Sequence, residues 1–139
     1  MGVEVFILRD RNLAYQRFYG RTTLEDCVAG LEHARPDGTI PADQKLLSDL
    51  RPVQEIDQNF HDVLRTVSRK AALDIEVTPG TEHAVLAPED LTFGMARMYQ
   101  QVSSEMLEFE VGVFRSERGA LDFLDQPEDT IAGLLATVG

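Results

Sequence analysis

Few side chains in this sequence stand at spacings that support catalysis or metal binding. Asp57 and His61 lie one helical turn apart in a predicted helix, so the acid could orient the imidazole, or both could face a metal ion. A metal site needs three or four ligands, and no second pair at ligand spacing follows, so we predict no metal and no cofactor. A helix-capping Asp beside a surface His is the simpler interpretation of the pair.

Signs of nucleophilic catalysis are equally weak. The sequence holds no Gly-x-Ser-x-Gly segment and no glycine-rich phosphate loop. Cys27 falls on the apolar stripe of its predicted helix, and a buried thiol is usually inert. Ser48 is predicted to be buried in a strand, and His83 to be a hydrogen-bonded residue at the start of an edge strand. We therefore predict that the protein is not an enzyme.

A set of polar and aromatic residues is predicted beyond the carboxyl ends of parallel strands, where open α/β sheets bind ligands. Backbone N–H groups at two helix starts could bind a small ligand or a partner there. Capping and ion pairing with surface acids is the favoured alternative, because such residues occur at helix starts in any α/β domain. Phe93, expected to be exposed, and Arg97 one turn later form a candidate contact patch. The set is Asp49, Arg51, Asp57, Asn59, Pro88, Thr92, Phe93, Arg97 and Arg115.

Length and charge restrict the class of protein. The 139 residues suit one domain, and 13 Lys and Arg against 24 Asp and Glu give a net charge of −11. Such a charge disfavours binding to nucleic acid and to anionic membranes. No apolar run is long enough to span a bilayer, the first residues do not resemble a signal peptide, and a single cysteine argues against a secreted, disulfide-bonded scaffold. We expect a cytoplasmic protein.

Hydrophobic periodicity predicts alternating strands and helices. A short polar turn between the first two strands, 3–8 and 13–19, indicates an antiparallel hairpin. Further strands are predicted at 45–50, 83–87 and 109–114, and helices at 24–34, 60–71 after an Asp57 cap, 90–106, 120–124 and 131–138. The helix at 90–106 is expected to bury one stripe, formed by Leu91, Gly94, Met95, Met98, Val102 and Met106.

This order predicts a single α/β domain with a mixed, mostly parallel five-stranded sheet that opens with a β-hairpin. We expect residues 1–125 to form the domain, with helices packed mainly on one face of the sheet. We expect residues 126–139 to form a C-terminal amphipathic helix, whose apolar stripe from Ile131 to Val138 packs either on its own domain or on a second copy.

The pattern resembles the SpoIIAA-like branch of the STAS fold, which is related in shape to CRAL-TRIO modules. The segments that carry the resemblance are Leu46–Arg51, Ile56–Asn59, Ala84–Leu91, Phe93–Met98, Val113–Arg115 and Leu121–Leu124. In STAS anti-sigma-factor antagonists, a serine of an Asp-Ser-Ser-Gly-type segment is phosphorylated. The matching stretch here, Asp57-Gln58-Asn59-Phe60, has no hydroxyl, so the usual phosphorylation switch is absent.

The leading hypothesis is a non-enzymatic STAS-like module that regulates or scaffolds a protein partner, and that forms a homodimer through the terminal stripe. The alternative, implied by the resemblance to CRAL-TRIO modules, is a binder or carrier of a small apolar or lipid-like ligand. A third hypothesis is an enzyme that uses Asp57 and His61 as an acid–base pair.

Overall fold

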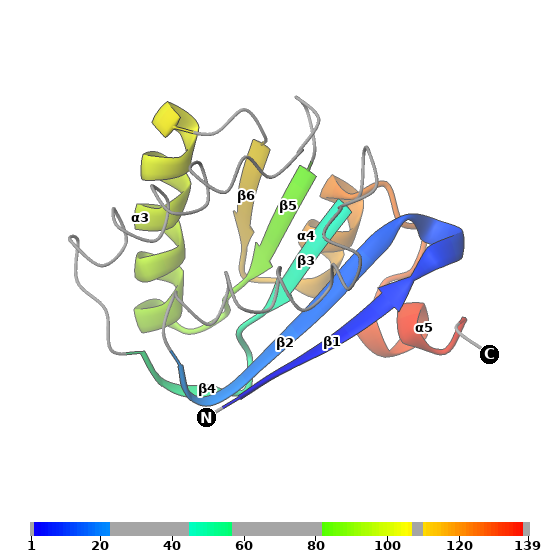
Figure 1. Ribbon diagram of the computed structural model, residues 1–139, viewed down its shortest axis with the longest axis horizontal. Helices are drawn as coiled ribbons and strands as arrows, with labels where there is room; N and C mark the ends of the chain where they lie inside the picture. Colours follow the sequence, from blue (N-terminus) through cyan, green and yellow to red (C-terminus); the bar gives the residue numbers. More distant parts are fainter. Residues whose placement is uncertain (1, 23–44, 57–81, 107–109, 138–139) are drawn as a thin grey trace, which may run out of the picture.

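The computed structural model describes residues 2–22, 45–56, 82–106 and 110–137 (Figure 1). The predicted helices at 24–34 and 60–71, and with them Asp57, Asn59 and His61, lie outside this part of the chain. The elements are β1 Gly2–Leu8, the 3-10 helix Arg9–Arg11, β2 Leu13–Thr22, β3 Lys45–Asp49, β4 Val53–Ile56, β5 Glu82–Leu86, α3 Asp90–Met106, β6 Glu110–Phe114, α4 Glu117–Phe123 and α5 Ile131–Leu135.

The first two strands form the predicted hairpin. They pair antiparallel over the whole of β1, from Gly2 opposite Tyr19 to Leu8 opposite Leu13. The chain reverses at Asn12, which adopts a left-handed conformation with a φ of 50° that asparagine tolerates better than most residues. A one-turn 3-10 helix precedes it, and the turn predicted for this polar segment is therefore confirmed.

The main sheet has the order β1-β2-β3-β5-β6, and all of its pairs after the hairpin are parallel. The predicted mixed, mostly parallel sheet opening with a hairpin is therefore confirmed. A sixth strand, β4, corrects the predicted number of five, since it pairs with the far end of β2 beyond a bulge between Gly20 and Arg21. Gly20 has a φ of 72°, which permits this bend, and its N–H donates to the Pro52 carbonyl at 3.2 Å. A short strand directly after Pro52 has too little hydrophobic pattern to be predicted.

The described helices lie on both faces of the sheet. Alternation of side chains along each strand sends Tyr15 and Leu47 to the face covered by α4 and α5, and Phe18 and Val85 to the face covered by α3. The expectation that helices pack mainly on one face does not hold for α3, α4 and α5, which are divided between the two faces. The helices predicted at 24–34 and 60–71 lie outside the described residues.

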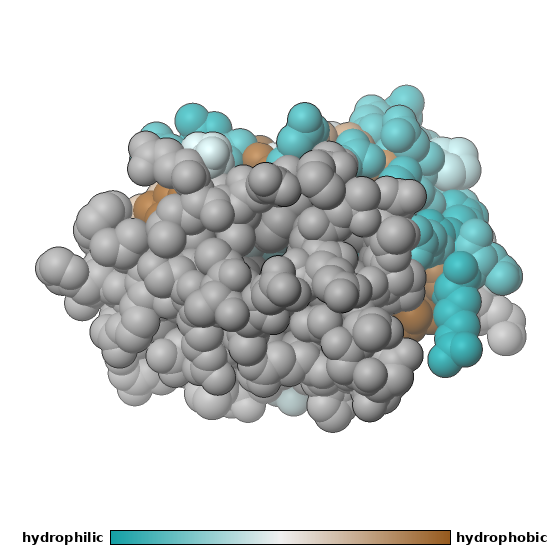
Figure 2. Space-filling view, turned by 45° about the horizontal axis from the view of Figure 1, so that its top comes forward, coloured by the Kyte–Doolittle hydropathy of each residue, from teal (hydrophilic) through white to brown (hydrophobic). Residues whose placement is uncertain are grey.

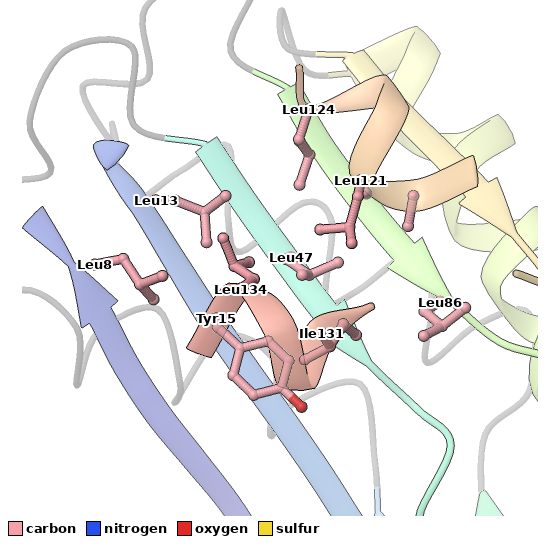
Figure 3. Close-up of a cluster of buried hydrophobic side chains, with 11 residues drawn as sticks. Leu8, Leu13, Tyr15, Leu47, Leu86, Leu121, Leu124, Ile131 and Leu134 are labelled. Carbon is pink, nitrogen blue, oxygen red and sulfur yellow. The ribbon is translucent and has the colours of Figure 1, made fainter. Parts of the chain in front are cut away.

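The C-terminal helix belongs to the core of the domain. Ile131 and Leu134 are 1% and 0% exposed, and they pack with Leu8 and Tyr15 in the hydrophobic cluster drawn in Figure 3. Thr130 caps the helix through a hydrogen bond from the Gly133 N–H at 3.0 Å. The interpretation of this stripe as unused surface is therefore wrong, and it no longer supports a homodimer.

Helix α3 is rotated relative to the face predicted for it. Its most buried residues are Thr92, Ala96, Tyr99 and Val102, whereas Leu91 is 60% exposed. Of the predicted stripe only Val102 is among these four, and a small alanine and two hydroxyl-bearing side chains make up the rest. Thr92 can be buried because its hydroxyl donates to the Glu89 carbonyl at 3.2 Å.

Candidate functional site

The predicted site residues that the structure describes fall into two clusters at the carboxyl ends of the parallel strands. Asp49 is the last residue of β3 and Arg51 follows it, and they form the first cluster. The loops after β5 and β6 and the start of α3 form the second. The structure also reveals a third group of polar residues, on the α3 face of the sheet, that the sequence analysis did not bring together.

The first cluster is centred on a buried carboxylate. Asp49 is 0% exposed, and its Oδ1 accepts hydrogen bonds from the backbone N–H and the Nε of Arg51, both at 3.0 Å. Its Oδ2 accepts from Arg51 Nη2 at 2.8 Å and from the Tyr15 hydroxyl at 2.6 Å. With four donors the carboxylate is fully satisfied, so the cluster has no free acceptor to offer a ligand.

These contacts shift three pKa values. Burial opposes ionisation of Asp49, but the hydrogen bonds from Arg51 and Tyr15 outweigh it and hold the pKa of Asp49 below its usual value. Burial, together with the hydrogen bond to Asp49, raises the pKa of Tyr15. The hydrogen bond to Asp49 likewise raises the pKa of Arg51. The group is thus a neutral phenol and a stable ion pair at ordinary pH, which suits a structural role better than proton transfer.

The ion pair also connects the sheet to the C-terminal helices. Arg51 Nη1 lies 3.1 Å from Glu117 Oε1 at the start of α4. The same oxygen accepts a hydrogen bond from the backbone N–H of Ile131 at 2.9 Å. The carboxyl end of β3 is therefore joined through one network to both α4 and α5.

This network predicts a loss of stability in acid. Because the folded-state pKa of Asp49 is depressed, its contribution is fully present above its unfolded pKa of about 4 and is lost as pH falls through the lower folded value. We expect urea unfolding to show a free energy that decreases between about pH 5 and pH 2, with a shallower decrease in Asp49→Ala. An identical pH dependence in the two proteins would show that Asp49 is not stabilised by its partners.

The second cluster surrounds Arg115. Its guanidinium carbon lies 4.1 Å from the centroid of the Phe93 ring, and its Nη1 donates to the Pro88 carbonyl and pairs with Asp90, both at 2.9 Å. Phe93 is half-buried and packs against the core on the α3 face, so the expectation of an exposed ring is only partly met. Arg97, one turn further, is exposed and donates to Gln100 Oε1 at 2.8 Å. The Phe93 ring is in contact with a cation, but that cation is Arg115 and not the predicted Arg97.

The third group is a buried polar row across β2, β3, β5 and α3, formed by Gln16, Ser48, His83 and Tyr99, each at most 4% exposed. Ser48 Oγ lies 2.8 Å from His83 Nε2, and the Tyr99 hydroxyl lies 3.4 Å from His83 Nδ1. Ser48 is buried as predicted, but His83 is not an edge residue, since β5 lies between β3 and β6. Sequence patterns missed the row because its strand members come from three separate segments.

Ser48 and His83 are as close as a nucleophile and its base. The Ser48 hydroxyl has two hydrogen-bond contacts, to Gln16 Oε1 at 3.2 Å and to His83 Nε2 at 2.8 Å. Both Ser48 and His83 are only 2% exposed, so the hydroxyl is not open to a substrate, and this arrangement does not favour acyl transfer.

The row ends on an unpaired donor. Gln16 is 1% exposed, and its Nε2 has no hydrogen-bond partner within the described part of the chain. A buried amide left in this condition costs about 1–3 kcal/mol. An atom held at this cost is a candidate for recognition of a bound molecule.

The described segments show neither a group of metal ligands nor a membrane-spanning helix. They contain no group of three or more His, Cys, Asp or Glu residues placed to hold a metal ion. None of their helices combines the length and the hydropathy needed to cross a bilayer.

Comparison with known proteins identifies the fold. No family model and no curated protein matches the chain. The solved structure of an uncharacterised protein from the DUF3478 family, with a SpoIIAA-like fold and from Shewanella loihica, matches with a TM-score of 0.54 and 19% sequence identity. The match covers 88% of this chain and 94% of that one. The expected SpoIIAA-like fold is therefore confirmed, and at this identity the likeness describes the fold alone.

Proposed function

We propose that this SpoIIAA-like domain is a non-enzymatic, cytoplasmic interaction module that regulates or scaffolds a protein partner through the first half of α3. The observation that carries the proposal is Leu91, a large apolar side chain left 60% exposed in the first turn of a helix. It lies in a domain whose described charged groups at the strand ends are already paired with one another.

The surface around Leu91 has the composition of a protein interface. A Cβ built on Gly94 would meet nothing within 4 Å, and Met95 and Met98 are half-buried, so an open, mostly apolar strip runs along the helix. The Phe93–Arg115 stack stands at its start. Methionine, aromatic and arginine side chains are enriched at protein interfaces, and the exposed Leu91 lies beside them in α3. Most of the described residues that Figure 2 brings into view are hydrophilic, with small hydrophobic areas among them.

A different protein is favoured over a second copy of this chain as the partner. The homodimer was expected from the terminal stripe, and Ile131 and Leu134 of that stripe are buried in their own domain. A non-enzymatic role is supported by the hydrogen bond from Ser48 to Gln16 and by the ion pair of Asp49 with Arg51.

The test compares two substitutions of the same character at exposed helix positions. Leu91→Asp places a charge on the α3 strip, and Ala132→Asp places one on α5 as a control. In quantitative affinity capture followed by titration with the recovered protein, we expect Leu91→Asp to weaken binding at least tenfold and Ala132→Asp to leave it unchanged.

Equal binding by both variants would exclude the α3 strip as the docking surface. Native mass spectrometry of the wild type, expected to show a monomer, provides the second criterion. A dimer that Leu91→Asp dissociates would assign the strip to self-association and would contradict a heterologous partner.

A further inference from the structure

We propose that the α3 face of the sheet binds a small uncharged organic molecule through a carbonyl or hydroxyl oxygen, which accepts a hydrogen bond from Gln16 Nε2. This site is distinct from the α3 strip and does not depend on the proposed partner. It is defined by the buried polar row, in which Gln16 holds the last position.

The atoms of Gln16 identify the missing group as an acceptor. Gln16 Oε1 accepts a hydrogen bond from Ser48 Oγ, which also lies 2.8 Å from His83 Nε2. The Gln16 NH₂ group is left with protons to donate and no acceptor among the described residues. A ligand that completes this row must present an oxygen or another acceptor.

The surroundings of Gln16 favour an uncharged ligand. Its neighbours on the same face of β2 are Ala14 and Phe18, and the adjoining strands contribute Leu46 and Val85, all at most 4% exposed. No lysine or arginine is among the buried residues of the described segments, and the buried carboxylate of Asp49 is held by its own arginine. An anionic group would find no buried counter-ion among the described residues, which is strongly unfavourable, whereas a ketone, ester, amide or alcohol needs only the one hydrogen bond.

The experiment uses three probes of nearly the same shape. Acetophenone carries the carbonyl acceptor, α-methylstyrene replaces that oxygen with a CH₂ group, and benzoate carries a negative charge. Each is titrated to about 10 mM, suited to weak binding of a fragment, into ¹⁵N-labelled full-length protein while the Gln16 side-chain NH₂ signals are followed by NMR. The signals are assigned by through-bond correlation, so the wild-type result does not depend on any variant.

We expect acetophenone to shift the Gln16 NH₂ signals and to bind about three- to tenfold more tightly than α-methylstyrene, the difference that one neutral hydrogen bond provides. Gln16→Met, which keeps the length of the side chain but has no donor, should abolish this preference. Gln54→Met, at an exposed glutamine of β4, should retain it.

Three results would overturn the proposal. Equal affinity for acetophenone and α-methylstyrene would show that the amide recognises no acceptor. Tighter binding of benzoate than of acetophenone would contradict an uncharged ligand. An NH₂ group that acetophenone does not shift, and that shows contacts to a bound water, would mean that water alone completes the row.

Discussion

Replacing Asp49 with alanine is expected to lower the free energy of unfolding by about 3 kcal/mol. The substitution removes the acceptor of the Tyr15 hydroxyl, which is buried, and of three N–H groups of Arg51. Arg51 is 39% exposed at its side chain and regains part of its hydration, so the lower end of the range for breaking a buried ion pair applies. Urea unfolding at pH 7 measures the change.

An exposed aspartate provides the control for this prediction. Asp122 pairs with Arg118 on the surface at 3.6 Å, and Asp122→Ala should change stability by less than about 1 kcal/mol. Should Asp49→Ala prove as mild as Asp122→Ala, the strand-end network would not be a structural element, and a ligand-binding role for Asp49 would have to be reconsidered.

Leu134→Ala is expected to cost about 2–5 kcal/mol, because Leu134 is 0% exposed and its truncation leaves a cavity in the cluster shown in Figure 3. The same substitution at Leu91, which is 60% exposed, should change stability by less than about 0.5 kcal/mol. Thermal or urea unfolding of the two variants compares a core leucine with a surface leucine.

The dependence on protein concentration separates two roles of the terminal helix. If the helix packs on its own domain, the loss in Leu134→Ala is the same at low and high concentration. A loss that grows smaller on dilution would instead indicate that the helix stabilises a dimer, and would restore the homodimer expected from the amphipathic pattern of residues 131–138.

Local patterns account for the parts of the fold that were predicted correctly. The polar turn at residues 9–12 between two apolar alternations could only join antiparallel neighbours, and the hairpin follows from it. Short apolar runs placed β3, β5 and β6 within one or two residues. Strand β4 was not predicted, because it pairs with β2 at Gly20, far away along the chain. The rotation of α3 was not predicted, because the helix buries small and hydroxyl-bearing residues.

The candidate sites, like the fold, were predicted from the sequence only in part. Pairing of Arg51 and Arg115 with acids was anticipated from the abundance of acidic residues, although the partner of Arg51, Asp49, is buried and not on the surface. The polar row was not, because 32 residues separate Gln16 from Ser48 and 35 separate Ser48 from His83. In the sequence, a single polar residue within an apolar strand gives the same pattern whether its side chain bonds to another such residue or to none.

The sequence by itself determined the class of the fold, the opening hairpin, the positions of β3, β5 and β6 and the absence of familiar catalytic motifs, because these depend on residues close together in the chain. Only the tertiary structure decided that the terminal helix completes the core and that Leu91 faces solvent. Only the tertiary structure brings together the buried polar row that ends at Gln16. These properties depend on which strand faces meet which helices, and side-chain contacts between distant segments exist only once the sheet has formed.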